Sequence, residues 1–201
     1  MIVASRNYCK FYFDSLLFGM IPNPSNQILA LIERLSRLSE AEDWANDLNP
    51  AQMAALRYLA GANRFSRAPS HVAAFSGSTR GTVSQTLRAL ARKGLVTETR
   101  SQTDRRSISY TVTEAGLNVS QSGKAMTQAI AGLTPDQKQA VQEGLSDVLR
   151  TLLATRGGKP FGLCHQCRHH EKRGDGGYCR LLAVNLVQAE ANQICHEQEP
   201  A

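Results

Sequence analysis

Apolar residues recur every three or four positions in four stretches of the chain, and this spacing is typical of amphipathic helices. The stretches cover residues 25–48, 50–59, 114–130 and 134–153. The second and fourth open with a polar residue followed by proline, a pair that caps a helix and fixes its first turn. The apolar positions are Ile28, Leu31, Ile32, Leu35, Leu38, Trp44, Leu48, Met53, Leu56, Leu59, Ala60, Ala115, Leu117, Val119, Ala125, Met126, Ile130, Val141, Leu145, Val148, Leu149, Leu152 and Leu153.

Residues 69–113 lie between the second and third stretches and have a different pattern. A short helix signal with Pro69 in its first turn runs into the turn sequence 76–78. Ser78 or Thr79 is placed to cap a second helix by accepting a backbone N–H. The buried face of this second helix is predicted to comprise Val83, Leu87, Leu90 and Ala91.

A hairpin is predicted directly after this second helix. Gly94 ends the helix, since glycine readily takes the left-handed conformation found after a helix C-terminus. Residues 95–99 and 107–113 are rich in valine, threonine, isoleucine and tyrosine, as strands are. The polar residues 101–106 form the loop between them. Two short helices followed by such a hairpin predict a winged helix-turn-helix.

The outward face of the second helix carries the candidate DNA-binding residues. Its side chains are short donors and acceptors or arginines, which suit base edges in a major groove. Arginines at the tip of the hairpin suit an adjacent minor groove or phosphates. The helix contributes Thr79, Arg80, Gly81, Thr82, Ser84, Gln85 and Arg88, and the hairpin contributes Arg105 and Arg106.

The charge distribution favours nucleic acid as the partner. The net charge is +6, and residues 50–113 hold ten Lys and Arg against two Asp and Glu. No apolar run approaches the length that spans a bilayer, so we expect a cytoplasmic protein without membrane contact. No nucleotide-binding loop or nucleophile–base constellation is visible, and an enzyme is not expected.

Three segments together resemble the MarR family of dimeric winged-helix transcriptional regulators. They are Leu87-x-x-Leu90-x-x-Lys93-Gly94-Leu95-Val96, Asp104-Arg105-Arg106 and Val112-Thr113-Glu114-Ala115-Gly116. The resemblance covers about residues 25–155 and implies that residues 80–88 enter the major groove. It further implies that Asp104 braces one of the wing arginines, and that the N- and C-terminal helices interleave in a homodimer. Such a dimer would read a pseudo-palindromic operator in double-stranded DNA.

Four cysteines near the C-terminus predict a metal centre. Cys164, Cys167, Cys179 and Cys195 have the spacing C-x2-C-x11-C-x15-C, and the close pair can grip a metal from a single turn. Disulfides are disfavoured, because an unexported DNA-binding protein lies in a reducing compartment. Structural zinc is the alternative, although zinc sites usually have two close pairs.

An iron–sulfur cluster, [4Fe–4S] or [2Fe–2S], is the cofactor that we favour, because a larger centre accepts ligands from separate segments. The surrounding histidines are expected to hydrogen-bond around the centre. We expect residues 179–195 to be largely helical. Its apolar side chains are expected to dock on the end of the dimer helices, and they are Leu181, Leu182, Leu186, Val187 and Ile194.

The expected fold is mainly α with a small β wing (α+β), with long dimerisation helices and a small cysteine-rich tail. Its parts are a leader of uncertain status (1–20), an N-terminal dimerisation helix (21–49), the winged helix-turn-helix (50–113), C-terminal dimerisation helices (114–156) and the metal-binding tail (157–201). The expected function is a homodimeric DNA-binding regulator controlled by redox, iron or oxidants at the cluster. The alternatives are the same regulator with structural zinc, or a redox or electron-transfer protein that does not bind DNA.

Overall fold

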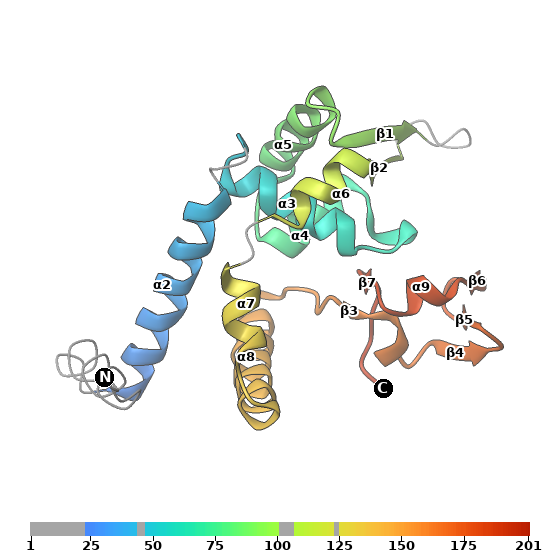
Figure 1. Cartoon of the computed structure of the whole chain (residues 1–201). Helices are drawn as coiled ribbons and strands as arrows, with labels where there is room; N and C mark the ends of the chain where they lie inside the picture. Colours follow the sequence, from blue (N-terminus) through green and yellow to red (C-terminus); the bar gives the residue numbers. More distant parts are fainter. Residues whose placement is uncertain (1–22, 44–46, 101–106, 123–124) are drawn as a thin grey trace, which may run out of the picture. The chain divides into compact units, whose positions relative to one another are not determined.

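The computed structural model describes residues 23–43, 47–100, 107–122 and 125–201 (Figure 1). The chain divides into two compact units, Met1–Glu42 and Asp43–Ala201. The second unit contains the winged helix-turn-helix and the cysteine-rich tail. None of the helices in the described ranges is both long and apolar enough to cross a membrane.

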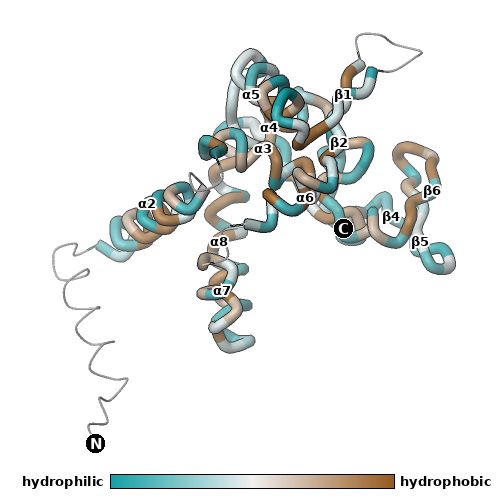
Figure 2. Tube along the Cα trace, turned by 45° about the horizontal axis from the view of Figure 1, so that its top comes forward, coloured by the Kyte–Doolittle hydropathy of each residue, from teal (hydrophilic) through white to brown (hydrophobic). Residues whose placement is uncertain are grey.

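The first unit contributes helix α2 (Pro24–Asp43), on which apolar and polar positions are interspersed (Figure 2). We expected this helix to reach Leu48. Leu48 instead follows a residue with positive φ, Asp47, and is buried in the core of the second unit. The predicted contribution of Trp44 lies outside the described residues. The large apolar side chains of α2 that remain exposed are Ile28, Leu29, Leu31, Leu35 and Leu38.

The helix-turn-helix is built as the sequence predicts. Its elements are α3 (Pro50–Gly61), the 3-10 turn η2 (Arg64–Ser66), α4 (Pro69–Ser76) and α5 (Arg80–Arg92). Asn49 forms a capping box with Gln52 at the start of α3, and Thr79 caps α5. Gly77 takes the left-handed conformation (φ 62°) that turns the chain between α4 and α5. The shared core includes Met53, Leu56, Leu59, Val72, Val83, Leu87 and Leu90, whereas Ala60 and Ala91 are only partly buried.

The wing consists of β1 (Val96–Arg100) and β2 (Ile108–Val112). They pair antiparallel, from Val96 opposite Val112 to Arg100 opposite Ile108. Gly94, with φ 71°, makes the turn from α5 into β1, as predicted. The wing tip, residues 101–106, lies outside the described residues.

Three helices follow the wing: α6 (Glu114–Ser120), α7 (Ala125–Ala131) and α8 (Pro135–Arg156). The single helix that we expected over 114–130 was wrong, because it is interrupted after Ser120. The hydroxyls of Ser120 and Ser122 donate to the carbonyl oxygens of Leu117 and Val119 (2.8 and 2.6 Å). Such local bonds compete with continuation of a helix. The restart at Thr134 is confirmed, with a capping box to Gln137.

The tail forms small sheets rather than the helix expected over 179–195. A two-stranded sheet pairs β3 (Gly162–Leu163) with β7 (Ile194–Cys195), and a three-stranded sheet has the order β4-β5-β6. The remaining elements are the turn η3 (Cys164–Gln166), β4 (His170–Arg173), β5 (Gly176–Cys179), β6 (Val184–Leu186) and the one-turn helix α9 (Gln188–Ala191). Residues 179–195 contain only one turn of helix because strands on both sides of it pair with other parts of the tail.

Gly116 allows α6 to approach the turn between α5 and β1. A Cβ atom on Gly116 would lie 2.1 Å from the carbonyl oxygen of Leu95 and 2.8 Å from a methyl carbon of Val112. Thr113 fixes this approach, because its N–H donates to the Leu95 carbonyl and its hydroxyl to that of Gly94 (3.0 and 2.8 Å).

We therefore expect Gly116→Ala to destabilise the protein by about 1–3 kcal/mol, the usual cost of overpacking. The matched control is Gly81→Ala in α5, where an added Cβ meets only ordinary contacts. Denaturant unfolding of both variants measures the difference. Equal midpoints for the two variants would show that the contact at Gly116 relaxes without cost.

Candidate nucleic-acid interface and thiol cluster

The exposed face of α5 holds the side chains that the sequence analysis assigned to DNA. Val83, Leu87 and Leu90 attach the helix to the core. This leaves Arg80, Gly81, Thr82, Gln85 and Arg88 exposed, with Ser84 half-buried. The structure therefore brings the predicted helix residues together on a single surface.

The hydroxyls on α5 are partly occupied by local bonds. The Thr79 Oγ1 accepts the Thr82 N–H at 3.2 Å and lies 2.8 Å from the Thr82 hydroxyl. The Ser84 hydroxyl donates to the Arg80 carbonyl at 2.8 Å. Ser84 therefore presents lone pairs rather than its proton to a ligand. The Gln85 amide and the Arg80 guanidinium make no hydrogen bond with any other described residue, and both can reach outward.

Three hydrogen-bonded side chains link the two strands of the wing. Tyr110 is buried, and its hydroxyl donates to Glu98 across the two strands at 2.7 Å. Arg100 donates to the other carboxylate oxygen of Glu98 at 3.0 Å. The bond from Tyr110 is the main cause that lowers the pKa of Glu98, which is therefore ionised at neutral pH. Burial raises the pKa of Tyr110 to about 12, so the tyrosine keeps its proton and stays a donor.

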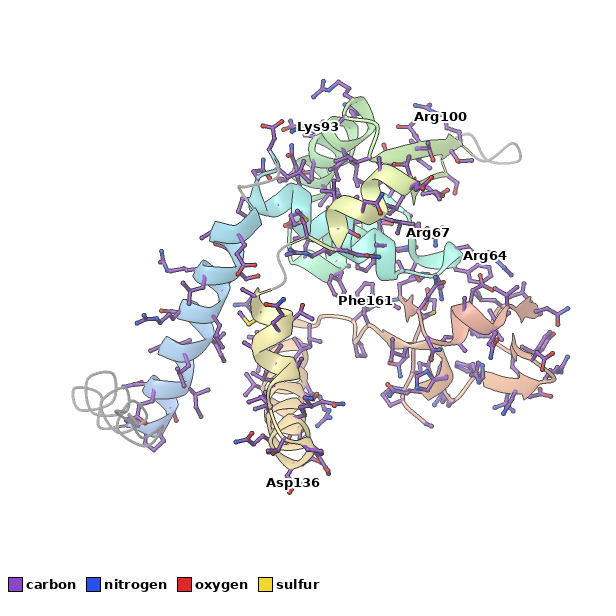
Figure 3. All side chains as sticks on the ribbon, in the orientation of Figure 1. Arg64, Arg67, Lys93, Arg100, Asp136 and Phe161 are labelled. Atoms are coloured by element: carbon purple, nitrogen blue, oxygen red, sulfur yellow. The ribbon has the colours of Figure 1, made fainter. Side chains whose placement is uncertain are left out.

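The sequence analysis missed Arg100 and its two partners. Arg100 projects from the end of β1 (Figure 3), on the strand that leads into the wing tip. The pairing of Glu98 with Tyr110 follows from the hairpin register and was available from the sequence. The predicted tip residues Asp104, Arg105 and Arg106 lie outside the described residues.

The four tail cysteines are reduced and buried, with exposed fractions of 5–9%. Cys164 and Cys167 lie at the two ends of turn η3, closed by the bond from the Cys167 N–H to the Cys164 carbonyl at 3.1 Å. Cys195 lies on β7, which pairs with the strand directly before Cys164. Cys179 is paired with His170 across β4 and β5. The fold thus places the other three cysteines, up to 31 residues away in sequence, where they act electrostatically on Cys164.

The thiols interact electrostatically. Burial, together with the smaller effects of the other three cysteines, raises the pKa of Cys164 to about 12. The Cys164 thiol therefore stays protonated at neutral pH when no cation is bound. A bound metal would reverse this preference, because a coordinating thiol is deprotonated outright.

The donor set matches soft metals or iron–sulfur clusters in chemistry. The described residues nevertheless include no group of three or more His, Cys, Asp or Glu side chains arranged to hold a metal ion. The buried Nε2 atoms of His169 and His170 have no hydrogen-bond partner within the described ranges. Buried polar atoms are rarely left unpaired, which makes this part of the tail suited to an additional bound group.

The tail docks on the helix-turn-helix, and the prediction that it docks on the dimer helices was wrong. Ile194 packs against the core beside Gly61, whereas Leu181 and Val187 are exposed. Phe161, which leads into the tail, contacts the rings of Tyr58 and Phe75 at centroid distances of 6.0 and 5.3 Å. Phe161 and Arg64 mark this region in Figure 3.

Two histidines meet where the tail docks. His71 of α4 stacks on His196 with ring centroids 3.5 Å apart. Burial lowers the pKa of both rings, and that of His71 to about 4, so both are neutral at pH 7. The sequence analysis did not pair them, since 125 positions separate them in the chain.

Comparison with known proteins agrees with this geometry. Residues 46–107 match the model of the MarR family. No curated protein sequence matches the chain.

Several solved structures share the fold. The MepR–DNA complex of Staphylococcus aureus has a TM-score of 0.52 and 18% identity, with 64% of this chain and 98% of MepR covered. FabT of Streptococcus pneumoniae in complex with DNA has a TM-score of 0.54 and 21% identity, with coverage of 65% and 96%. CouR of Rhodococcus jostii RHA1 bound to p-coumaroyl-CoA has a TM-score of 0.52 and 18% identity, with coverage of 65% and 92%.

Proposed function

We propose that this chain is a DNA-binding transcriptional regulator of the MarR type, because residues 46–107 match the model of that family, and that it binds a pseudo-palindromic operator as a homodimer. We further propose that the four tail thiols hold a metal centre whose state changes operator affinity. The observation that carries the first proposal is the exposed polar face of α5 beside a braced wing.

Charge and geometry support DNA as the ligand. Arg80, Gln85 and Arg88 lie on the exposed face of one helix and offer the donors that read base edges in a major groove. Arg100 adds positive charge at the end of β1, next to the wing tip. MepR and FabT, which share the fold, have been solved with DNA.

The exposed apolar side chains of α8 support a homodimer. Five of them, at helical spacing, remain 43–55% exposed in the single chain, and they are Val141, Leu145, Val148, Leu149 and Leu152. Contiguous exposed apolar surface of this kind marks an interaction site. A second copy of the chain covers it most simply, through a two-fold axis that also presents two α5 helices to DNA.

Burial of four reduced cysteines, together with a buried His170 Nε2 that has no hydrogen-bond partner among the described residues, supports the metal centre. We favour an iron–sulfur cluster held by Cys164, Cys167, Cys179 and Cys195, with zinc as the alternative. A cluster would supply sensitivity to oxidants and to iron, whereas zinc would supply only stability.

Selection of duplexes from a randomised DNA pool by the anaerobically purified protein tests the DNA proposal. We expect enrichment of an inverted repeat, with half-sites about one helical turn apart. The affinity for the selected duplex should fall steeply as salt rises, because phosphate contacts release counterions. Enrichment of no sequence, or of a single unrepeated half-site, would contradict the proposal.

Arg88→Ala should weaken binding of the selected duplex in a sequence-selective way. If Arg88 contacts a base edge, the expected loss is about 1–3 kcal/mol, confined to one base pair of each half-site. Fluorescence anisotropy against the duplex and its single-base variants measures this loss. Arg150→Ala on α8 removes the same charge from a distant exposed site and should leave the sequence preference unchanged. Equal losses on every duplex would assign Arg88 to a phosphate instead.

A further inference from the structure

The cysteine nearest the C-terminus lies in a segment that is hydrogen-bonded to the helix-turn-helix. We define Ile194, Cys195 and His196 as the docking segment. The Ile194 carbonyl accepts the Asn63 N–H at 3.0 Å, and Ile194 forms a bridge with Ala62. Ile194 and His196, the two neighbours of Cys195, can therefore hold the segment that connects α3 to α4.

Ser66 is the centre of this contact. It is fully buried, and its hydroxyl donates to the Asn63 side chain at 2.7 Å. The same oxygen accepts the His196 N–H at 2.9 Å and lies 3.3 Å from the His196 Nδ1. The Ser66 carbonyl in turn accepts the Tyr58 hydroxyl at 2.8 Å, which ties turn η2 to α3.

A second contact lies on the other side of η2. Arg64 forms an ion pair with Glu190 at 2.9 Å and donates to the Asn185 carbonyl at 2.8 Å. Glu190 is buried and also accepts the Val187 N–H at 2.9 Å. Phe65, between Arg64 and Ser66, packs against the cluster that contains Cys164 and Cys179. All three residues of η2 thus contact the tail.

Only one helix, α4, lies between these contacts and α5, the helix that we propose reads DNA. His196 stacks on His71 of α4, and α4 packs against α5. The His71 Nδ1 has no hydrogen-bond partner among the described residues, and the ring is held by this stacking contact together with the Ser66 backbone. A displacement of the docking segment would therefore remove the support of both η2 and the first helix of the helix-turn-helix.

We infer that the docking segment couples the thiol cluster to the DNA-binding domain, with Ser66 as the positioning residue that transmits the state of the cluster. The inference builds on the thiol centre and the switching proposed above. When the cluster is intact, Cys195 holds the segment in place, and Ser66, Asn63 and His71 keep their partners. When the cluster is lost, the segment is released and α4 loses its support.

Hydrogen exchange followed by mass spectrometry tests the mechanical part of this inference. Cys179→Ala disables the cluster without changing any side chain of the docking segment or its hydrogen bonds to Asn63 and Ser66. We expect faster exchange in peptides that span residues 61–76, as well as in the tail. Unchanged exchange over 61–76 would overturn the inference, whether or not the wild-type protein carries a metal.

The converse variant is Ser66→Ala, which removes the junction but none of the thiols. Anaerobically purified Ser66→Ala should keep the wild-type content of iron, sulfide and zinc. Chelator treatment should change wild-type affinity for the selected duplex about 5–150-fold, the usual range of allosteric coupling, and Ser66→Ala affinity much less. Ser120→Ala, which removes a hydroxyl bonded only within α6, should respond like the wild type.

The two measurements separate the failure of this inference from that of the proposed function. Coupling that is as strong in Ser66→Ala as in the wild type would overturn the role of Ser66. If chelation leaves wild-type DNA affinity unchanged but Cys179→Ala still loosens residues 61–76, the coupling stands and the proposed switching falls.

Discussion

A chain that carries Leu145→Glu and Leu149→Glu is expected to be monomeric and to lose its operator. Both leucines are about half exposed on the apolar side of α8. A two-fold interface would bury the introduced carboxylates without partners, which costs several kcal/mol for each ion. Dissociation also removes the second recognition helix from the complex. Because linked binding raises avidity by about 10²–10⁴-fold, we expect a loss of operator affinity of that size.

Sedimentation equilibrium gives the mass of the variant, and fluorescence anisotropy with the selected duplex gives its affinity. The matched control places two glutamates outside the apolar stripe of the same helix, at Ala140 and Thr151, which are also exposed. This control should remain dimeric and bind DNA nearly as well as the wild type. If the leucine variant stays dimeric, the apolar face of α8 is not the subunit interface, and the exposed face of α2 becomes the candidate.

The helix-turn-helix and the wing could be predicted because their signals are local. A cap, a glycine and a run of apolar positions each act over a few residues. Thr79, Gly94 and Thr134 behave in the structure as the sequence predicts. Directly after the wing, the predicted helix over 114–130 failed because of a competing local interaction, the serine hydroxyls that bond to the carbonyls of Leu117 and Val119.

The position of the tail could not be predicted from such signals. Ser66 and His196 are 130 positions apart, and neither belongs to a pattern that indicates a partner. The apolar residues of the tail indicated only that it docks, and Ile194 alone among them packs on the main core. The shared metal centre of the four cysteines stays a prediction from their residue type, because the described residues include no group of three or more ligands arranged around a metal ion. Residue type does not specify the surface on which the tail packs.

The four cysteines lead to a second prediction with a large expected effect, the loss of metal binding. Cys179→Ala is expected to abolish metal binding, because a four-thiolate centre that loses one ligand loses the geometry on which its affinity depends. Structural zinc contributes apparent binding free energies of about 10–16 kcal/mol in small peptides, so a centre of this kind dominates the stability of its segment. The tail should therefore unfold locally, while α3, α5 and the wing keep a core that contains none of the four cysteines.

Metal analysis and the visible spectrum of anaerobically purified protein decide both the identity of the centre and the effect of the substitution. Wild-type protein that is brown and contains iron with acid-labile sulfide carries a cluster, whereas colourless protein with one zinc per chain carries the alternative. Cys179→Ala should lack either metal, and its far-ultraviolet circular dichroism should retain the helical signal. Cys9→Ala removes the one cysteine outside the four-residue motif and should leave metal content and colour unchanged. Wild-type protein without iron or zinc would contradict the metal centre and would leave the four cysteines as free, buried side chains.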